Sequence, residues 1–287
     1  MDSHLRISPG QGSFRVLNSR PCARSLRQTK TPVLRDLSTA FVRRLQDRDA
    51  AAWYELWEIF APVLRAQLSR WGRGRIGPET VQDLSQETLA ALSGAIDRHD
   101  PSRGARFSTW LLAIAKHTLG DEIDRRMALK RGSGVRPASL EGDMDGAAQI
   151  LSPDDAYERN VFDAKVGAAL RAVERDCGFA EFEIFRMRIL QGNSGKDVAV
   201  ALGTSEPTIS RRLKKVREVL RTQLLEVFSR YSFTEDEWLE LSRNGLDLSP
   251  NKSEDAAFDE SVADIYHRLS RNASGTAEAA TNSSGRS

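Results

Sequence analysis

The side chains whose types and spacing could support metal binding or catalysis fall in one short stretch of the 287-residue chain. His117, Asp121 and Asp124 share one helix face at i, i+4 and i+7, and imidazole and carboxylate groups bind zinc. Three ligands from a single helix are sterically awkward for one ion, however, and the neighbouring cations oppose metal binding. The chain also carries no Ser/His/Asp set, Walker motif or HExxH motif. The sequence therefore predicts no catalytic residue, no metal ligand and no cofactor, so we expect a protein that is not an enzyme.

A different chemistry, nucleic-acid binding, is indicated by residues 195–219. A short helix over 196–202 is expected to end at Gly203, and Ser205 followed by Pro207 is a typical start of a second helix. Six apolar residues have the spacing that lets two helices pack across a tight turn, namely Val198, Ala199, Leu202, Ile209, Leu213 and Val216. The pattern predicts a helix-turn-helix, and the alternative is a cationic amphipathic helix on the surface.

The second helix of a helix-turn-helix enters the major groove of DNA and reads bases from its N-terminal end. Here that end carries short polar groups and cations, which suit bases and phosphates. The predicted DNA-contacting residues are Ser205, Glu206, Thr208, Ser210, Arg211, Arg212 and Lys215, and the cationic row continues through Lys214, Arg217 and Arg221.

An acidic helix is followed by a cationic one in residues 83–131. The first helix is expected over 78–93, with its leucines facing the core. Asp83, Gln86 and Glu87 then point outward. Such a patch suits a basic helical partner, although it could also be an ordinary solvated face.

The cationic helix is expected over 107–131, after a loop over 97–106. Its buried stripe is predicted to be Phe107, Leu111, Ile114 and Leu119. Phe107 and Trp110 could stack on unpaired bases, but their position beside this stripe favours core packing. Lys116 and Gly120 lie four residues apart on one face, and glycine inside a helix costs about 1 kcal/mol of helix propensity. Such a glycine would let either a phosphate backbone or a neighbouring helix approach closely.

No stretch of the chain has the alternation of a strand, so the sequence predicts an all-α protein. We expect two small helical modules, residues 35–131 and 153–231, joined by a flexible Gly-rich linker over 132–152. A disordered basic arm (1–34) precedes them, and an acidic extension with a disordered tail (232–287) follows. Helices of the second module are expected over 155–176, 179–191, 195–202 and 206–229.

These features in this order resemble the sigma-70 family of RNA polymerase sigma factors, and in particular its compact extracytoplasmic-function (ECF) type. The resemblance covers about residues 35–230. It is carried by DLSQE (83–87), by RFSTWLLAIAKHTLGDEIDRR (106–126) and by the C-terminal helix-turn-helix. It implies a transcription-initiation subunit whose partners are core RNA polymerase and promoter DNA, and it leaves open whether an anti-sigma factor binds as well.

The resemblance also implies roles for individual residues. Asp83, Gln86 and Glu87 would dock on the clamp helices of core RNA polymerase, and the helix-turn-helix would read the −35 promoter element. The loop over 100–106 and the helix after it would melt and read the −10 element, which needs a held, unstacked base and cations for the separated backbone. The implied −10 residues are Ser102, Arg103, Arg106, Trp110, Lys116, Gly120, Arg125 and Arg126. Glu122 and Asp124 depart from the mostly basic composition of many relatives near the end of this helix.

Two other functions remain open at the level of the sequence. A helix-turn-helix regulator that binds duplex DNA without polymerase would explain residues 155–230 but would give residues 35–131 no role. A regulatory protein that titrates a partner and never directs transcription would explain the interaction surfaces without a promoter.

The formal net charge of +2 hides an uneven distribution. Residues 1–35 hold seven Arg/Lys against one Asp, whereas residues 233–271 hold ten Asp/Glu against four Arg/Lys. The acidic tail could fold over a cationic DNA-binding face and restrain it, or it could be a solvated or partner-binding extension. Cys22 and Cys177 are expected to be free thiols in a reducing cytosol. Because no apolar run is long enough to cross a bilayer, a cytoplasmic protein without membrane insertion is expected.

Overall fold

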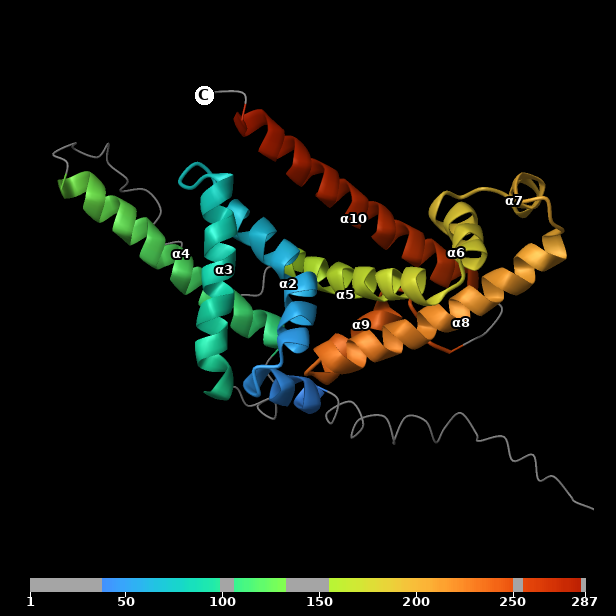
Figure 1. Cartoon of the computed structure of the whole chain (residues 1–287), viewed down its shortest axis with the longest axis horizontal. Coiled ribbons are helices and arrows are strands. Elements are labelled where there is room, and N and C mark those ends of the chain that lie inside the picture. The colour runs from blue at the N-terminus through green and yellow to red at the C-terminus, as the bar shows by residue number, and fades with distance from the viewer. Residues whose placement is uncertain (1–37, 99–105, 133–154, 250–254, 285–287) are drawn as a thin grey trace, which may run out of the picture.

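The computed structural model describes residues 38–98, 106–132, 155–249 and 255–284 (Figure 1), with side chains described for all but 130–132 and 273–284. Within these ranges the regular structure is helical and no strand is present, so the predicted all-α class is confirmed. The basic arm and the Gly-rich linker lie outside the described residues.

The first module consists of a helix over residues 38–46 and the helices α2 (Ala50–Trp71), α3 (Pro78–Ala95) and α4 (Phe107–Gly132), with one short turn of 3₁₀-helix (Ile96–Arg98) after α3. The side chain of Asp49 caps α2 by accepting a hydrogen bond from the Ala51 amide at 2.9 Å. Pro78 occupies the first turn of α3, where its missing N–H costs nothing. Leu56, Phe60 and Leu64 of α2 form the centre of the first core.

The second module is formed by α5 (Asp155–Asp176), α6 (Phe179–Phe185), α7 (Gly195–Ala201) and α8 (Glu206–Tyr231). These bounds agree closely with the prediction, except that the helix expected over 179–191 changes to a π-helical turn at Arg186–Leu190. A single widened turn of this kind is too local to alter the apolar periodicity from which the helix was predicted.

The acidic extension is part of the second module, because α9 (Glu235–Arg243) and α10 (Asp255–Ser284) contribute to its core. The buried apolar residues that the extension contributes to this core are Leu241, Leu246, Phe258, Val262 and Ile265. The prediction of a disordered tail is wrong for the backbone as far as Ser284, which continues α10. Alanine makes this stretch compatible with a helix although glycine and serine are frequent in it. The C-terminal end of α10 projects away from the second module (Figure 1).

The two modules are packed against each other through aromatic side chains. The ring of Tyr231, at the end of α8, lies 4.8 Å from Phe41 and 6.4 Å from Phe60 of the first module. The ring of Phe233 stacks on Phe107 at 5.5 Å. Because buried aromatic surface contributes strongly to association, these contacts form a continuous core between the modules.

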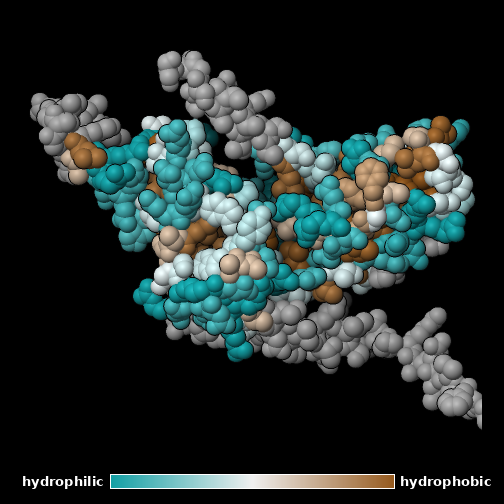
Figure 2. All heavy atoms as spheres, viewed as in Figure 1, coloured by the Kyte–Doolittle hydropathy of each residue, from teal (hydrophilic) through white to brown (hydrophobic). Residues whose placement is uncertain are grey.

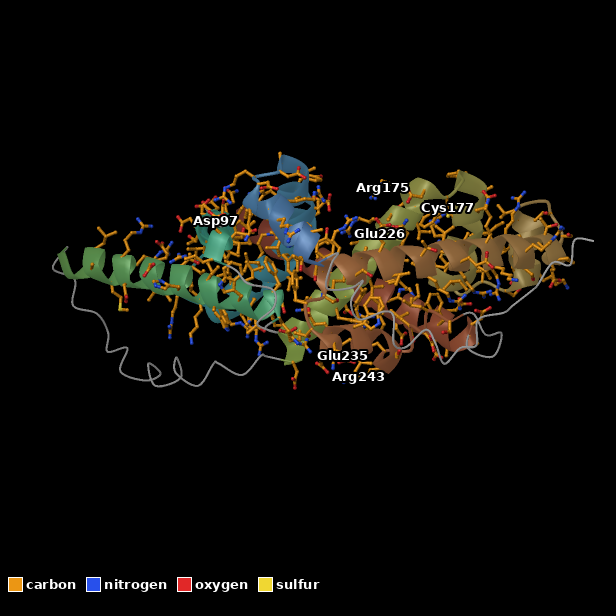
Figure 3. The ribbon with its side chains drawn as sticks, turned by 90° about the horizontal axis from the view of Figure 1, so that it is seen from below. Asp97, Arg175, Cys177, Glu226, Glu235 and Arg243 are labelled. Atoms are coloured by element: carbon orange, nitrogen blue, oxygen red, sulfur yellow. The ribbon has the colours of Figure 1, made fainter. Side chains whose placement is uncertain are left out.

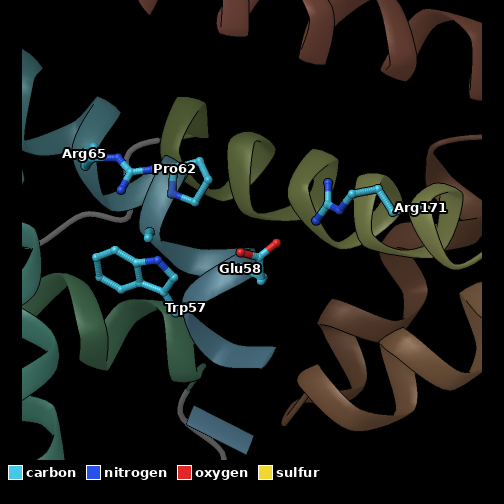
Figure 4. Close-up of a pocket in the computed structure, with 6 residues that line it drawn as sticks. Trp57, Glu58, Pro62, Arg65 and Arg171 are labelled. Atoms are coloured by element: carbon cyan, nitrogen blue, oxygen red, sulfur yellow. The ribbon is translucent and has the colours of Figure 1, made fainter. Parts of the chain in front are cut away.

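Beside this interface, α2 and α5 border a solvent-open hollow of about 220 Å³. Glu58 and Pro62 of α2 line it together with Arg171 of α5 (Figure 4). Proline has no N–H to donate, so the Glu58 carbonyl loses its helical partner, and the hollow leaves room for water there. Trp57 and Arg65 also line the hollow, and the Arg65 guanidinium lies 5.6 Å from the centroid of the Trp57 ring.

A buried ion pair fastens α9 to α5. The Lys165 Nζ lies 3.0 Å from Glu237 Oε1, and the two side chains are 1% and 2% exposed. Glu237 Oε2 also accepts hydrogen bonds from the amides of Phe233 (2.8 Å) and Thr234 (3.0 Å). Burial alone would raise the pKa of Glu237, but the Lys165 charge and these hydrogen bonds hold it below its usual value.

We predict that Lys165→Met lowers the free energy of unfolding by about 3–5 kcal/mol, because it leaves a buried carboxylate without its counter-charge. The double variant Lys165→Met/Glu237→Gln should recover part of that loss, since it removes both charges. Urea unfolding followed by circular dichroism measures both changes. A single variant within about 1 kcal/mol of the wild type would contradict a structural role for the pair.

The carboxyl group of Glu237 also makes the folding stability depend on pH. Because the pKa of Glu237 is lower in the folded chain than the ordinary 4.5, its contribution to stability is complete above pH 4.5 and is lost as the pH falls through the folded-state pKa. Unfolding free energies should therefore fall more steeply on acidification for the wild type than for Glu237→Gln. Parallel pH profiles for the two proteins would refute this assignment.

Candidate nucleic-acid interface

The helix-turn-helix has the predicted geometry apart from one residue. Ser194 caps α7 by accepting a hydrogen bond from the Asp197 amide at 3.1 Å. Gly203 adopts a φ of +59° in the turn, a left-handed conformation that suits glycine. The apolar residues predicted to pack across the turn are buried, except Leu202, which is 39% exposed. The prediction for Leu202 is wrong because α7 ends at Ala201, so this side chain lies beyond the packed face.

The start of α8 presents the predicted polar surface. Ser205, Glu206, Ser210, Arg211 and Lys215 are exposed, and Thr208 and Arg212 are half-buried. The hydroxyl groups of Ser205 and Thr208 lie 3.0 Å apart, and Arg211 Nη2 donates to Thr208 Oγ1 at 3.4 Å. These local bonds hold the polar groups together at the end of the helix where a recognition helix would enter a groove.

Two cations of the predicted row belong to the interior instead. Arg217 Nε donates to Asp259 at 2.8 Å, and Arg221 Nη2 donates to Asp255 at 2.6 Å. The Arg221 guanidinium also lies 4.6 Å from the Phe258 ring. The prediction that Arg217 and Arg221 continue the DNA-contacting row is therefore wrong, because both attach α10 to α8.

Exposed apolar side chains gather next to this motif. Phe179 at the start of α6 and Val200 on α7 are among the most exposed large hydrophobic residues of the described chain. Figure 2 shows hydrophobic surface at this end of the second module. The helix-turn-helix thus has an apolar neighbour as well as a cationic face.

The acid–amide patch on α3 faces outward as predicted. Asp83, Gln86 and Glu87 are exposed, while Leu84 and Leu92 are buried on the opposite side of the helix. The patch is thus free of the first module's core and can meet another molecule.

The aromatic residues at the start of α4 pack in the core, as their spacing favoured. Phe107 is buried, with its ring 5.5 Å from Phe60 and 5.8 Å from Trp110. Trp110 is half-buried and packs against the same cluster. Part of the Trp110 ring therefore stays accessible, whereas Phe107 has no surface left for a base.

Gly120 lies on the exposed face of α4, one turn after the half-buried Lys116. A Cβ atom built on Gly120 would meet nothing within 4 Å. Of the two roles that the sequence left open, tight packing against a helix of this chain is therefore excluded within the described residues. Close approach by an external partner remains a prediction.

Arg125 and Arg126 are both held by Glu122, which is almost completely buried. Their Nε atoms donate to the two carboxylate oxygens at 2.7 and 2.5 Å. Arg126 Nη2 also donates to Thr80 Oγ1 at 2.7 Å, which ties α4 to the first turn of α3. The acid that departs from the basic pattern thus orients Arg125 and Arg126, and Arg126 has a structural partner on α3 as well as its predicted DNA role.

Arg106 is surrounded by carboxylates of the second module. Its Nη1 donates to Glu158 of α5 at 3.0 Å and to Glu240 of α9 at 2.7 Å, and its Nη2 donates to Asp236 of α9. The side chain is only 19% exposed. The other two predicted loop residues, Ser102 and Arg103, lie outside the described residues.

Comparison with known proteins agrees with this geometry. Residues 56–128, which include α3 and most of α4, match the family model of sigma-70 region 2. The ECF RNA polymerase sigma factor SigC of Mycobacterium tuberculosis is 31% identical over 142 residues, which cover 49% of this chain and 68% of that protein. This chain belongs to the sigma-70 family, in its ECF group.

Two further relatives of this sigma-family chain carry similar names. The probable RNA polymerase sigma-C factor of Mycobacterium bovis shows the same identity and coverage as SigC. The ECF RNA polymerase sigma factor RpoE of Cereibacter sphaeroides is 25% identical over 188 residues, which cover 64% of this chain and 93% of RpoE. The longer match to RpoE extends beyond region 2, so the likeness is not confined to the first module.

Of the three residues first considered for metal binding, two contact each other. His117 Nδ1 lies 3.1 Å from Asp121 Oδ2, and both side chains are exposed. Across the described ranges, no group of three or more His, Cys, Asp or Glu side chains could hold a metal ion. The helices of this part of the chain also include none that is long and apolar enough to cross a membrane.

The carboxylates around Arg106 are the residues that the sequence analysis missed. Glu158, Asp236 and Glu240 lie 52, 130 and 134 positions from Arg106 in the chain. An indirect signal existed, because Asp163 and Lys165 place charges in an otherwise apolar stretch of the sequence of α5. Charges at such positions indicate buried partners from another element.

We predict that Gly120→Ala raises the free energy of unfolding by up to about 1 kcal/mol, because the added methyl group meets open space and alanine favours a helix. If a phosphate backbone approaches this glycine, the same variant should bind single-stranded DNA more weakly. Thermal unfolding and fluorescence anisotropy measure the two effects. Gly94→Ala, in α3 and equally unobstructed, is the matched control for stability alone.

Proposed function

We propose that this chain is a sigma factor that binds core RNA polymerase and directs promoter-specific initiation of transcription. The observation that carries the proposal is the match of residues 56–128 to sigma-70 region 2 in a chain that also presents a helix-turn-helix. The first module would then meet the polymerase and the −10 element, and the second module would meet the −35 element. The chemistry of RNA synthesis would belong to the core enzyme.

The polymerase contact is assigned to Asp83, Gln86 and Glu87 on the exposed side of α3. An acid–amide patch on a rigid helix can pair with cations and amide groups on a basic helical partner. The patch lies on the side of α3 opposite its buried leucines, so docking would not disturb the core of the first module.

Recognition of the −35 element is assigned to the start of α8. Ser205, Thr208 and Ser210 offer short donors and acceptors to base edges, while Arg211 and Lys215 offer cations to guanine or phosphate. Glu206 can accept a hydrogen bond from the amino group of cytosine. Arg212 is half-buried and would reach the backbone at the side of the groove.

Opening of the −10 element is assigned to α4 and the loop before it. Trp110 keeps part of its ring exposed and could stack on an unpaired base, and Lys116 with Arg125 would follow the separated backbone. Gly120 would let that backbone come close to the helix. Arg106 would bind a phosphate once it is released from its carboxylate partners.

The two other functions are weaker. A regulator that works without polymerase would use the helix-turn-helix but would leave the region 2 match without a role. A protein that only titrates a partner would not need the polar groups at the start of α8.

The decisive experiment combines purified core RNA polymerase with this chain on a pool of fragments of the source genome. We expect transcripts whose start sites share two upstream elements at a fixed spacing. Core polymerase without the chain is the control. The absence of any promoter-specific transcript, with core polymerase active on a nicked template, would refute the proposed function.

We predict that Arg211→Ala/Arg212→Ala lowers the affinity for promoter duplex by about 1–3 kcal/mol per lost base contact but leaves core polymerase binding intact. Asp83→Asn/Glu87→Gln should show the opposite pattern, with weaker polymerase binding and unchanged affinity for duplex DNA. Anisotropy with labelled promoter and a pull-down of core polymerase measure the two affinities. Arg175→Ala and Glu174→Gln, exposed residues of α5, are the matched controls. If both pairs weakened both interactions equally, the division of labour would be wrong.

A further inference from the structure

Arg106 of the first module is bound by three carboxylates of the second module. It lies directly before α4, at the end of the loop to which the proposed function assigns −10 recognition, and it contacts Glu158, Asp236 and Glu240. A guanidinium has five N–H donors in a fixed fork, and three carboxylates leave little of that fork for a phosphate. Arg106 therefore cannot bind these carboxylates and a DNA backbone at the same time.

The carboxylates come from a rigid support. Thr234 and Glu237 form a capping box at the start of α9, in which Thr234 Oγ1 accepts from the Glu237 amide at 3.2 Å. The buried pair of Glu237 with Lys165 fixes the same turn to α5. Asp236 also forms an ion pair with Arg243 at 2.7 Å. The turn of α9 that carries Asp236 is thus held in place by contacts that do not involve Arg106.

A second set of hydrogen bonds joins the two modules at the same interface. The Tyr157 hydroxyl donates to the Ser108 carbonyl at 3.0 Å, and the Ser108 hydroxyl donates to Glu158 at 3.2 Å. On the far side, Arg230 Nη1 donates to Glu55 at 2.7 Å. Ser108 is only two residues from Arg106, so the start of α4 is bound to the second module by both backbone and side chains.

We propose that the packed arrangement of the two modules is an inactive state of the free protein, in which α9 occupies Arg106 in place of the nucleic-acid backbone. This inference rests on the proposed function, because it treats the start of α4 as a DNA-binding surface. Release of Arg106 requires α9 and the start of α5 to move away from α4 together. Only the open fraction of molecules binds DNA, so the apparent dissociation constant is the intrinsic one divided by that fraction.

The test compares two variants that lose the same charge. Asp236→Asn/Glu240→Gln removes two of the acids at Arg106 and retains their shape. Glu235→Gln/Glu260→Gln removes two exposed acids from the same extension, and neither is among the Arg106 contacts. Glu235 lies at the outer edge of α9 (Figure 3). Circular dichroism confirms first that both variants are folded.

Two readouts are needed. The first is the distance between spin labels at Arg73→Cys, in the turn after α2, and Phe179→Cys, at the start of α6, in a chain with Cys22→Ser and Cys177→Ser. The second is the affinity for a fluorescein-labelled single-stranded DNA 20-mer of mixed sequence. We expect a longer and broader distance distribution for Asp236→Asn/Glu240→Gln and an affinity at least about fivefold higher than that of the charge control. Adding Arg106→Ala should abolish the difference between the two variants.

Equal affinities in the two variants would overturn the proposal, because the gain would then reflect net charge alone. An unchanged distance distribution in Asp236→Asn/Glu240→Gln would overturn it as well. Failure of the proposed function would appear elsewhere, as a wild-type chain that neither binds core polymerase nor gives a promoter-specific transcript. The two failures are therefore distinguishable.

Discussion

Helix α5 contributes side chains to both hydrophobic cores of the protein, so each part of it must fit a different set of neighbours. Tyr157 and Val161 belong to the core of the first module, whereas Val166 and Leu170 belong to that of the second. A helix enclosed in this way has little exposed surface, and yet Asp163 and Lys165 carry charges in its middle. Buried charges are tolerated when they are paired, and both partners come from the acidic extension. Glu237 of α9 binds Lys165, and Arg268 of α10 binds Asp163 at 2.8 Å. The extension is therefore required by the interior of the fold.

This requirement divides the cations of the chain into two groups. Arg126, Arg217 and Arg221 connect helices of this chain, whereas Arg211 at the start of α8 is exposed. Arg106 has features of both groups. It connects the two modules through carboxylates, and a phosphate could take the place of these carboxylates. The acidic tail does not cover the whole cationic surface of the protein. In the described residues the tail binds Arg106, α5 and the middle of α8 through Arg217 and Arg221, while the exposed start of α8 carries none of these contacts.

The sequence predicted what depends on local pattern. The bounds of α4, α5 and α8, the outward position of Asp83 and the buried position of Phe107 all follow from a 3.6-residue period, which is a property of neighbouring residues. The packing of the modules does not, because Tyr231 and Phe233 carry no local mark that distinguishes a partner in one module from a partner in the other. The role of an arginine is equally hidden. Arg211 and Arg217 look alike in the chain, and only the distant Asp259 distinguishes the half-buried, ion-paired Arg217 from the exposed Arg211.

The stacking of Phe233 on Phe107 has a consequence for synthesis on the ribosome. The first module emerges complete in sequence while the side chains that cover Phe41, Phe60 and Phe107 are still to be made. Phe233 follows Phe107 by more than a hundred residues, which corresponds to roughly 6 to 25 s at elongation rates of about 5–20 residues per second. During this interval the nascent chain presents an uncovered aromatic face. A binding partner or chaperone that reaches the ribosome early would meet the first module in a form that the finished protein conceals.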